Sequence, residues 1–460
     1  MRRHLGGLGP SGVGAARVNT PPRSGNAGSP RRVLLVTSSY APAVIADMHR
    51  VRHLAWELPR YGWECEVLAP DESFQRPQHL EPESHRLFNP AVPYHAVPPR
   101  AAWLFRALQV RSIGWRAWQP LACAGAALLR QRRFDLVYIS TANFNLFCLG
   151  RAWARRFGVP YVLDYHDPWV RERTDYRTTR HPWKLWVNAQ LARWLERRAL
   201  TGAAGVVAVS PVYLEELRRR YGAMPALRPE RCAAIPFAGS EVDFSTPQSS
   251  AGESDGPLDI LYVGAGGAIM AKSFSTICAT VARVAADQPQ LLAGIKLRLL
   301  GTHGDWRPGD PKPLEAIAAR HGLGTAIEEA PMRVSYQKAN DLIRCSAGLL
   351  VLGVDDVAYM PSKLFNFALS GKPLLGCFAA GSPPAQLFAQ TPDLGHLLTF
   401  GADEPAATTA GLAAVTAFLT EVQARRQFDR RALLEPHLAP AMARRHAALF
   451  ERVCEPVLTA

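Results

Sequence analysis

The chain has 460 residues, with 53 Lys and Arg against 39 Asp and Glu, and a formal net charge of +14 at pH 7. That length excludes a small disulfide-stapled fold and predicts two to four domains. The positive charge is concentrated in one half: residues 1–250 hold 34 Lys and Arg against 19 Asp and Glu, and residues 251–460 hold 19 against 20. A composition rich in arginine does not explain this separation, so we expect the two halves to face different partners.

The cysteines and the hydropathy pattern indicate a reducing compartment. None of the eight cysteines forms a C-x-x-C pair, and most lie in apolar strings, as buried free thiols do. Residues 1–31 lack the apolar core of a signal peptide, so we expect a disordered leader there. No window of 18 consecutive apolar residues occurs. We therefore predict no membrane span and a cytoplasmic location, which leaves peripheral attachment to the inner face of the membrane open.

Strands alternate with helices along the first half of the chain. Apolar runs predict strands at 33–37, 64–69, 134–140, 159–165 and 205–209, each suited to a sheet that is covered on both faces. Helical spacing predicts helices between these strands. The longest of them has one apolar face, made of Trp183, Trp186, Val187, Leu191, Trp194 and Leu195.

The alternation restarts after a polar stretch rich in Gly, Ser and Pro at 245–257, which predicts a linker. Further strands are predicted at 258–263, 295–300, 348–352 and 373–378. The expected fold class is α/β, with two Rossmann-like, doubly wound parallel sheets facing across a cleft. Ligands of such folds bind at the carboxyl ends of the strands, so we place the site in that cleft.

These patterns divide the chain into five parts. We expect the leader at 1–31, an N-terminal Rossmann-like domain at 32–244, the linker at 245–257 and a C-terminal Rossmann-like domain at 258–435. A final helix in 436–460 is expected to pack back on the N-terminal domain.

The segment Ala358 to Pro373 carries the most specific pattern. Pro361 and Ser362 predict the start of a helix, Lys363 follows, and Gly371 ends the helix before the next strand. Free amides and a lysine at a helix start favour an anion. An ordinary capped helix with a surface lysine explains the same residues equally well.

This segment resembles the donor-binding helix of family-4-like, retaining glycosyltransferases of the GT-B fold, where P-S-K-x-x-E-x-x-A-x-G-K-P is a frequent form. The opening stretch from Leu34 to Leu68, the Phe134–Tyr138 strand and the Gly158–Asp167 run resemble the same family. The resemblance spans about residues 32–425. It implies that the N-terminal domain binds the acceptor and the C-terminal domain binds the nucleotide sugar. It further implies transfer of a sugar from a nucleotide-diphosphate donor, with no protein nucleophile.

Two departures from the family pattern concern the donor. The family has a pair of glutamates eight positions apart, and here those positions hold Ala358 and Asn366, with Asp355 and Asp356 as the nearest acids. Asn366 could still form a hydrogen bond with a ribose hydroxyl, without charge assistance. The family's Gly-Gly loop after the first strand is replaced by residues 44–46, Val-Ile-Ala.

A second glycine-rich turn follows the first strand of the C-terminal half, at Gly264, Gly266 and Gly267. Ile269 occupies the third glycine position of a dinucleotide fingerprint, which disfavours a nicotinamide enzyme. The resemblance implies that donor-diphosphate ligands lie in this loop, with Lys272 and Lys363 as the neutralising cations. A plain glycine turn with a solvated lysine is the alternative.

His166 and Asp167 follow a predicted strand, at the edge where α/β sheets bind ligands. The resemblance implies that they line the cleft near the transferred sugar and act in catalysis. A structural histidine held by Asp164 or Asp167 is equally consistent with the sequence.

Residues 101–133 alternate arginines with aromatic and apolar residues and contain no acid. Such a stretch suits either an anionic membrane surface or a helical insertion with a solvated arginine face. We assign Arg50, Arg130, Arg132 and Arg133 to the acceptor or membrane side. Nucleic acid is not expected as a partner, because no recognised binding motif accompanies the charge.

The sequence therefore predicts a glycosyltransferase that uses a nucleotide sugar and a saccharide or lipid-linked acceptor, in cell-surface polysaccharide or glycolipid assembly. No D-x-D motif occurs, so no metal and no other cofactor is expected. A non-catalytic scaffold or carbohydrate-binding protein of the same fold, and a sugar-nucleotide epimerase, remain as alternatives.

Overall fold

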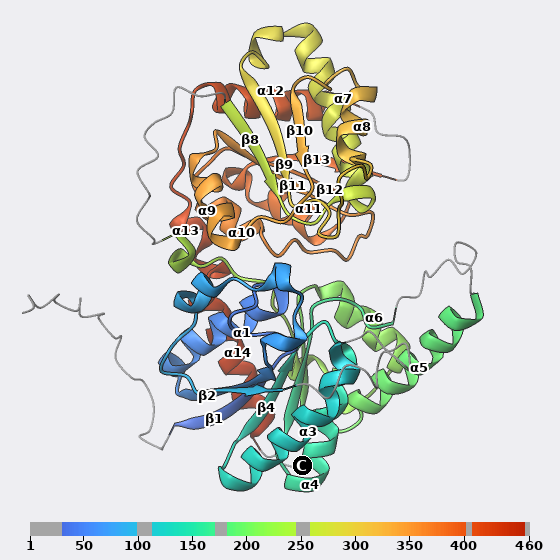
Figure 1. The fold of residues 1–460 in the computed structure, drawn as a ribbon, viewed down its shortest axis with the longest axis vertical. Helices are drawn as coiled ribbons and strands as arrows, with labels where there is room; N and C mark the ends of the chain where they lie inside the picture. Colours follow the sequence, from blue (N-terminus) through green and yellow to red (C-terminus); the bar gives the residue numbers. More distant parts are fainter. Residues whose placement is uncertain (1–29, 99–112, 171–181, 245–257, 402–406, 456–460) are drawn as a thin grey trace, which may run out of the picture.

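The computed structural model describes residues 30–98, 113–170, 182–244, 258–401 and 407–455. They form two α/β domains, one above the other in Figure 1. The predicted linker lies outside the described residues, as does nearly all of the predicted leader.

The N-terminal domain is built on a sheet of seven strands in the order β3-β2-β1-β4-β5-β6-β7. All neighbouring pairs are parallel, and most residues of the central strands are buried. The strands are β1 (Arg31–Val36), β2 (Trp63–Pro70), β3 (Tyr94–Val97), β4 (Leu136–Ser140), β5 (Tyr161–Tyr165), β6 (Gly205–Ala208) and β7 (Cys232–Ala234).

The C-terminal domain repeats this arrangement with six parallel strands in the order β10-β9-β8-β11-β12-β13. The strands are β8 (Leu258–Val263), β9 (Ile295–Leu300), β10 (Ile327–Ala330), β11 (Gly348–Leu352), β12 (Leu374–Ala379) and β13 (His396–Phe400). The predicted fold class, two doubly wound parallel sheets, is therefore confirmed.

Helices cover both faces of each sheet. Those of the N-terminal domain are α1 (Ala46–Glu57), α3 (Ile113–Gln131), α4 (Phe147–Phe157), α5 (Pro182–Leu200) and α6 (Pro211–Tyr221). Those that follow β8 are α7 (Ala271–Asp287), α8 (Pro313–Arg320), α9 (Tyr336–Cys345), α10 (Leu364–Leu369), α11 (Pro383–Gln390), α12 (Thr409–Gln423), α13 (Arg431–Leu434) and α14 (Ala439–Cys454).

The last helix, α14, returns to the N-terminal domain and lies beside α1 and the strands of the first sheet (Figure 1). Phe450 is fully buried and meets the Trp63 ring edge-on, with the centroids 5.4 Å apart. The Tyr138 hydroxyl and His446 Nε2 are 3.0 Å apart inside this contact. The chain thus crosses between the domains twice, which restricts how far they can separate.

One segment, Gly267–Asp287, is long and apolar enough to cross a membrane by length and composition alone, the only such helix among the described residues. It contains α7, whose residues Phe274, Ile277 and Cys278 are buried against the second sheet and α12. This packing is that of a core helix in an α/β domain.

Candidate functional site

A cleft of about 840 Å³, partly open to solvent, lies between the two domains. Its N-terminal wall comes from the loop after β1 and the start of α1, at Val44, Ile45, Ala46 and His49. Its C-terminal wall follows the ends of β8, β9 and β10 and includes Gly264, Gly301, Arg333, Tyr336, Ser362, Lys363 and Asn366. Both walls are thus built at the carboxyl ends of parallel strands, as expected for this fold class.

Two cations of the C-terminal domain line the cleft. Lys363 Nζ donates to the backbone oxygen of Val263 at 3.0 Å, and Arg333 donates to Glu81 at 3.3 Å and to the backbone oxygen of Val44. The Lys363 residue is exposed to the open cleft, yet partial withdrawal of its ammonium from water and the nearby Arg333 lower its pKa to about 8. No described residue that lines this cleft is an Asp or Glu. The cleft is therefore suited to an anionic ligand.

The glycine-rich turn supports the lysine. A Cβ at Gly264 would lie 3.0 Å from Lys363 Nζ, so a side chain at this position would displace the ammonium by a few tenths of an ångström. Gly266 N–H donates to the Thr302 oxygen at 2.9 Å, and Gly267 has a φ of 73°. Gly264 lines the cleft, whereas Gly266 and Gly267 shape the turn behind it.

The structure places Lys272 outside the cleft. Its ammonium pairs with Asp355 at 2.6 Å, both side chains are largely exposed, and the residue does not line the cleft. The helix after Pro361 is also shorter than predicted, because α10 begins at Leu364 and Lys363 is its N-cap. Ser362 lines the cleft, while Pro361 is buried and does not.

Asn366 is engaged in a contact between the domains and is not free to meet a ribose. Its Oδ1 accepts from the Ser240 N–H at 2.9 Å, and its Nδ2 lies 3.2 Å from both Asp243 Oδ2 and the Tyr336 hydroxyl. All of its polar atoms therefore have protein partners, and the expected role in donor binding is not supported in this arrangement.

Asp243, in the 3-10 turn that precedes the predicted linker, is the centre of this contact. Arg52 of α1 binds it with both ends of the guanidinium, at 2.7 and 2.9 Å, and Tyr336 of α9 donates to it at 2.6 Å. Burial alone would raise the pKa of Asp243, but Arg52 offsets this and holds it well below the ordinary value. The network thus joins one helix from each domain to the chain that connects them.

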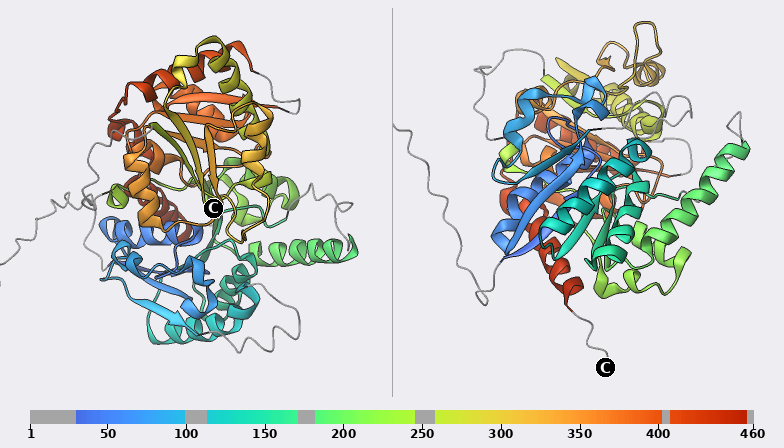
Figure 2. Two further views of the ribbon diagram at one scale, coloured as in Figure 1. Left: turned by 45° about the horizontal axis from the view of Figure 1, so that its top comes forward. Right: turned by 60° about the horizontal axis from the view of Figure 1, so that its bottom comes forward.

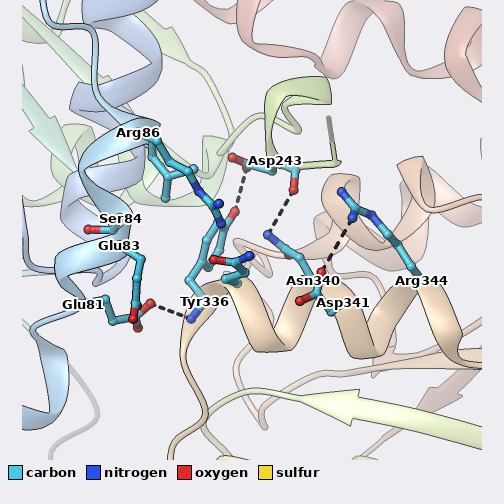
Figure 3. A pocket seen from close by; sticks show the side chains of 11 residues that line it. Glu81, Glu83, Ser84, Arg86, Asp243, Tyr336, Asn340, Asp341 and Arg344 are labelled. Atoms are coloured by element: carbon cyan, nitrogen blue, oxygen red, sulfur yellow. Dashed lines mark hydrogen bonds and ion pairs between the residues drawn. The ribbon is translucent and has the colours of Figure 1, made fainter. Parts of the chain in front are cut away.

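A polar seam continues from this network to the outside of the molecule (Figure 3). Glu81 accepts from the Tyr336 N–H at the start of α9, at 2.6 Å, and also receives Arg333. Asn340 donates to the Asp243 backbone oxygen, and Asp341 and Arg344 form an ion pair on the same helix. Because Glu81 and Asp243 of the N-terminal domain form hydrogen bonds with α9 of the C-terminal domain, this seam holds the two domains together.

His166 lies beneath the N-terminal wall, almost fully buried between two carboxylates. Its Nε2 is 2.9 Å from Asp164 Oδ2 and its Nδ1 is 3.6 Å from Asp47 Oδ1. Burial alone would lower the pKa of His166, but Asp164 and Asp47 raise it to about 9. His166 is thus a buried imidazolium that holds β5 to the start of α1, which supports the structural alternative for this residue and adds Asp47 as an unforeseen partner.

The remaining predicted residues lie in three different places. Asp167 is exposed at the end of β5; burial raises the pKa of Tyr359 in the other domain, and the Asp167 charge raises it further. Arg50, expected at the acceptor surface, is instead fully buried, 3.2 Å from Asp164, and donates to the backbone of Ile235 and Pro236.

Arg130, Arg132 and Arg133 lie at the end of α3, before β4 begins. They therefore lie at the edge of the sheet opposite to the cleft and do not line it. Arg132 donates to the Glu66 carboxylate at 2.8 Å. The other part of the predicted basic stretch, 101–112, lies outside the described residues.

Sequence reasoning missed Arg333 and His49. Arg333 follows β10, whose sequence Ile-Glu-Glu-Ala lacks the apolar run of the other strands. His49 lines the cleft, and its Nδ1 is 3.1 Å from Arg52 Nη2. Burial and the Arg52 charge lower the pKa of His49 to about 3, so it is neutral, with Nε2 carrying the proton.

The Asp243 contact predicts a large effect on stability. We expect Asp243→Asn to lower the free energy of unfolding by about 3–5 kcal/mol, because it leaves the Arg52 charge buried without its carboxylate. Urea denaturation followed by fluorescence measures this. Asp305→Asn is the control, because Asp305 pairs with Arg76 across the same boundary but is exposed, and it should leave the free energy of unfolding nearly unchanged. Equal effects of the two variants would contradict the assigned role of Asp243.

The raised pKa of His166 predicts a pH-dependent contribution to stability. Since its folded pKa of about 9 exceeds the unfolded value, the contribution is complete below about pH 6.5 and is lost as the pH rises through 9. The difference in stability between the wild type and His166→Gln should shrink over that range, by roughly 3 kcal/mol. Melting temperatures from pH 6 to 9.5 test this, with the exposed His85→Gln as a control whose difference stays constant. A constant difference for His166→Gln would show that no imidazolium is buried there.

The comparisons with known proteins agree with this architecture. The model of the glycosyl transferase 4-like domain matches residues 49–238. A search of curated proteins finds no significant match. Solved structures match over nearly the whole chain at low identity: Anabaena HepE in complex with UDP-glucose (14% identity, 91% of this chain and 98% of that chain, TM-score 0.55) and a UDP-forming trehalose-phosphate synthase from Burkholderia xenovorans (14%, 93% and 100%, 0.57). The lipopolysaccharide outer core galactosyltransferase WaaB matches similarly (13%, 92% and 99%, 0.51). Residues 49–238 are therefore similar to a glycosyl transferase 4-like domain, and the chain as a whole has the two-domain GT-B fold of these structures.

Proposed function

We propose that this protein is a retaining glycosyltransferase that moves a sugar from a nucleotide-diphosphate donor to a saccharide or lipid-linked acceptor. The observation that carries the proposal is the interdomain cleft, which presents Arg333 and Lys363 and has no carboxylate among its described lining residues. The glycosyl transferase 4-like domain and the UDP-glucose bound by the structurally similar HepE support it.

The C-terminal wall supplies the charge that a departing diphosphate needs. Lys363 and Arg333 would neutralise the developing negative charge as the glycosidic bond to the phosphate breaks. His49 can donate from Nε2 to a ligand oxygen, because Arg52 occupies its other nitrogen. Groups other than Asn366 would bind the ribose, because the Asn366 amide already forms hydrogen bonds with Ser240 and Asp243.

Among the described residues of the N-terminal wall, the one titratable side chain is His49, and its Nδ1 is occupied by Arg52. The leaving phosphate of the donor would therefore receive the acceptor proton. His166 is protonated and held by two carboxylates, so we assign it the positioning of the strand edge and not the role of a base. Asp167 stays a candidate for acceptor contact, because it is exposed at the end of β5. The enzyme would thus act through positioning and charge stabilisation.

We further propose a donor of the UDP-glucose type, a metal-independent reaction, and a cytoplasmic role in cell-surface polysaccharide or glycolipid synthesis. The two cleft cations support metal independence, because they can take the place of a cation on the diphosphate. Product formation that persists in excess EDTA would support it, and rescue by added Mg²⁺ or Mn²⁺ would oppose it.

A non-catalytic protein that binds nucleotide sugars is the second candidate. It is favoured by Ala358, which is buried in the apolar core, and by Asn366, since neither position provides a carboxylate at the cleft. Asp355 and Asp356 do not replace them, because one pairs with Lys272 and the other accepts from the Ala358 N–H at 2.9 Å. Binding of UDP-glucose without release of UDP in the presence of acceptors would favour this candidate, and conversion to an isomerised nucleotide sugar would favour an epimerase.

The two cleft cations predict the effect of substitution on nucleotide binding. Lys363→Ala and Arg333→Ala should each weaken UDP binding about 10- to 100-fold, the effect of losing one charge-assisted contact. Isothermal titration calorimetry measures the dissociation constants. Lys272→Ala is the matched control and should change them less than about threefold, because Lys272 pairs with Asp355 outside the cleft. A larger loss in Lys272→Ala than in Lys363→Ala would relocate the diphosphate to the α7 side of the turn.

The pKa of Lys363 predicts a pH dependence of the same binding. With a pKa of about 8, the free protein loses the ammonium charge as the pH rises, and UDP affinity should fall about tenfold from pH 7 to pH 9. Calorimetry in buffers of different ionisation enthalpy should show proton uptake on binding near pH 8. Lys363→Ala should abolish both effects, and their persistence in that variant would assign them to another group.

A further inference from the structure

The first turns of α5 project from the body of the N-terminal domain, as both views in Figure 2 show. From residue 183 to residue 194 no residue of this helix is buried, and burial begins only at Leu195. The exposed fractions reach 63% for Trp183, 57% for Trp186 and 58% for Trp194. Three exposed tryptophans on one helix are unusual for a surface that meets only water.

These tryptophans form part of one continuous face. Positions 183, 186, 187, 191 and 194 follow helical spacing, and the residues there are all large and apolar, with Val187 and Leu191 also exposed. The sequence predicted this apolar face, but within the described part of the chain nothing covers it. We call these five residues the α5 face.

The charges around the α5 face are basic. Lys184 and Arg198 lie over the rings of Trp183 and Trp194, at 5.5 and 5.4 Å, and Arg193 and Arg197 are exposed on the same helix. The one acid of α5, Glu196, is buried and accepts from Arg220 at 2.7 Å. Tryptophan with lysine and arginine on an exposed amphipathic helix complements the interfacial region of an anionic bilayer.

The α5 face is continuous with the acceptor side of the molecule. An open groove of about 710 Å³ runs from Asn188, Leu191 and Leu195 to Phe144 and Trp169. Phe144 stacks on Trp169 with centroids 5.7 Å apart, and these residues follow β4 and β5 at the strand edge that carries Asp167. A lipid chain that leaves a bilayer at α5 would therefore enter an aromatic groove at the acceptor edge.

We propose that the α5 face binds an anionic lipid bilayer and presents the aromatic groove to a membrane-borne acceptor. Membrane binding by α5 stands on its own observations, while the role of the groove rests on the proposed glycosyltransferase function. The docking surface is thus α5, and not the arginines at 130–133, which lie at the far edge of the sheet.

Co-sedimentation with phosphatidylglycerol–phosphatidylcholine vesicles, compared with pure phosphatidylcholine vesicles, tests the proposal. The full chain should bind the anionic vesicles at least tenfold more strongly. Trp183→Ser/Trp186→Ser/Trp194→Ser should reduce that binding at least tenfold and abolish a blue shift of tryptophan emission. The matched triple variant Arg130→Gln/Arg132→Gln/Arg133→Gln should keep both.

Further measurements separate this proposal from folding and from the proposed function. The tryptophan variant should keep the wild-type melting temperature, because the replaced side chains are exposed, and the wild-type affinity for UDP in solution. If the wild type does not bind UDP, the proposed function is wrong, while the vesicle result still supports membrane binding by α5.

Three outcomes would overturn membrane binding by α5. They are equal vesicle binding by the tryptophan variant, loss of binding in the arginine variant alone, and a wild-type dimer that becomes monomeric in the tryptophan variant without any vesicle binding. The last outcome would assign the α5 face to a second copy of the chain.

Discussion

The buried Asp243 carboxylate joins the two halves of this molecule, because Arg52 pairs with it from the first domain while Tyr336 and Asn366 donate to it from the second. One carboxylate receives a guanidinium from α1, a hydroxyl from α9 and an amide from α10, and it belongs to the chain that leaves the first domain. A buried charge pair is stable only when its geometry and remaining hydrogen bonds are satisfied. Separating the domains would break several of these bonds together, so this network sets the width of the cleft beside it.

Ion pairing of this kind determines which charges line the cleft, and the result differs from what the net charge of the two halves suggests. The N-terminal half holds the positive surplus, yet its buried cations Arg50, Arg52 and His166 are paired with Asp164, Asp243 and Asp47. The nearly neutral C-terminal half supplies both cations that line the cleft, Lys363 and Arg333, of which Arg333 also pairs with Glu81. The positive charge at the cleft therefore lies on its C-terminal wall, while the described residues of the opposite wall carry no charge.

Periodicity predicted the architecture, because parallel strands buried on both faces must be apolar throughout and helices between them must be amphipathic. It missed short strands such as β10, whose Ile-Glu-Glu-Ala has no such run, and with it Arg333. The sequence also identified Lys363 and His166 as candidate site residues. The roles of such residues depend on partners that are distant in the sequence. Asn366 meets Ser240 and Asp243, Lys272 meets Asp355, and His166 meets Asp47, and no local pattern encodes these pairings.

The α5 face shows a second limit of sequence periodicity. Helical spacing of Trp183, Trp186 and Trp194 establishes that they share a side, and both a packed core helix and an exposed interfacial helix satisfy that spacing. Only the fold distinguishes them: α5 is anchored by Leu195, Ala199 and Leu200, and its earlier turns extend beyond the sheet that could have covered them. Since the groove from α5 reaches Phe144 and Trp169, which follow β4 and β5, a surface that binds a bilayer at α5 would bring lipid to the carboxyl edge of the first sheet.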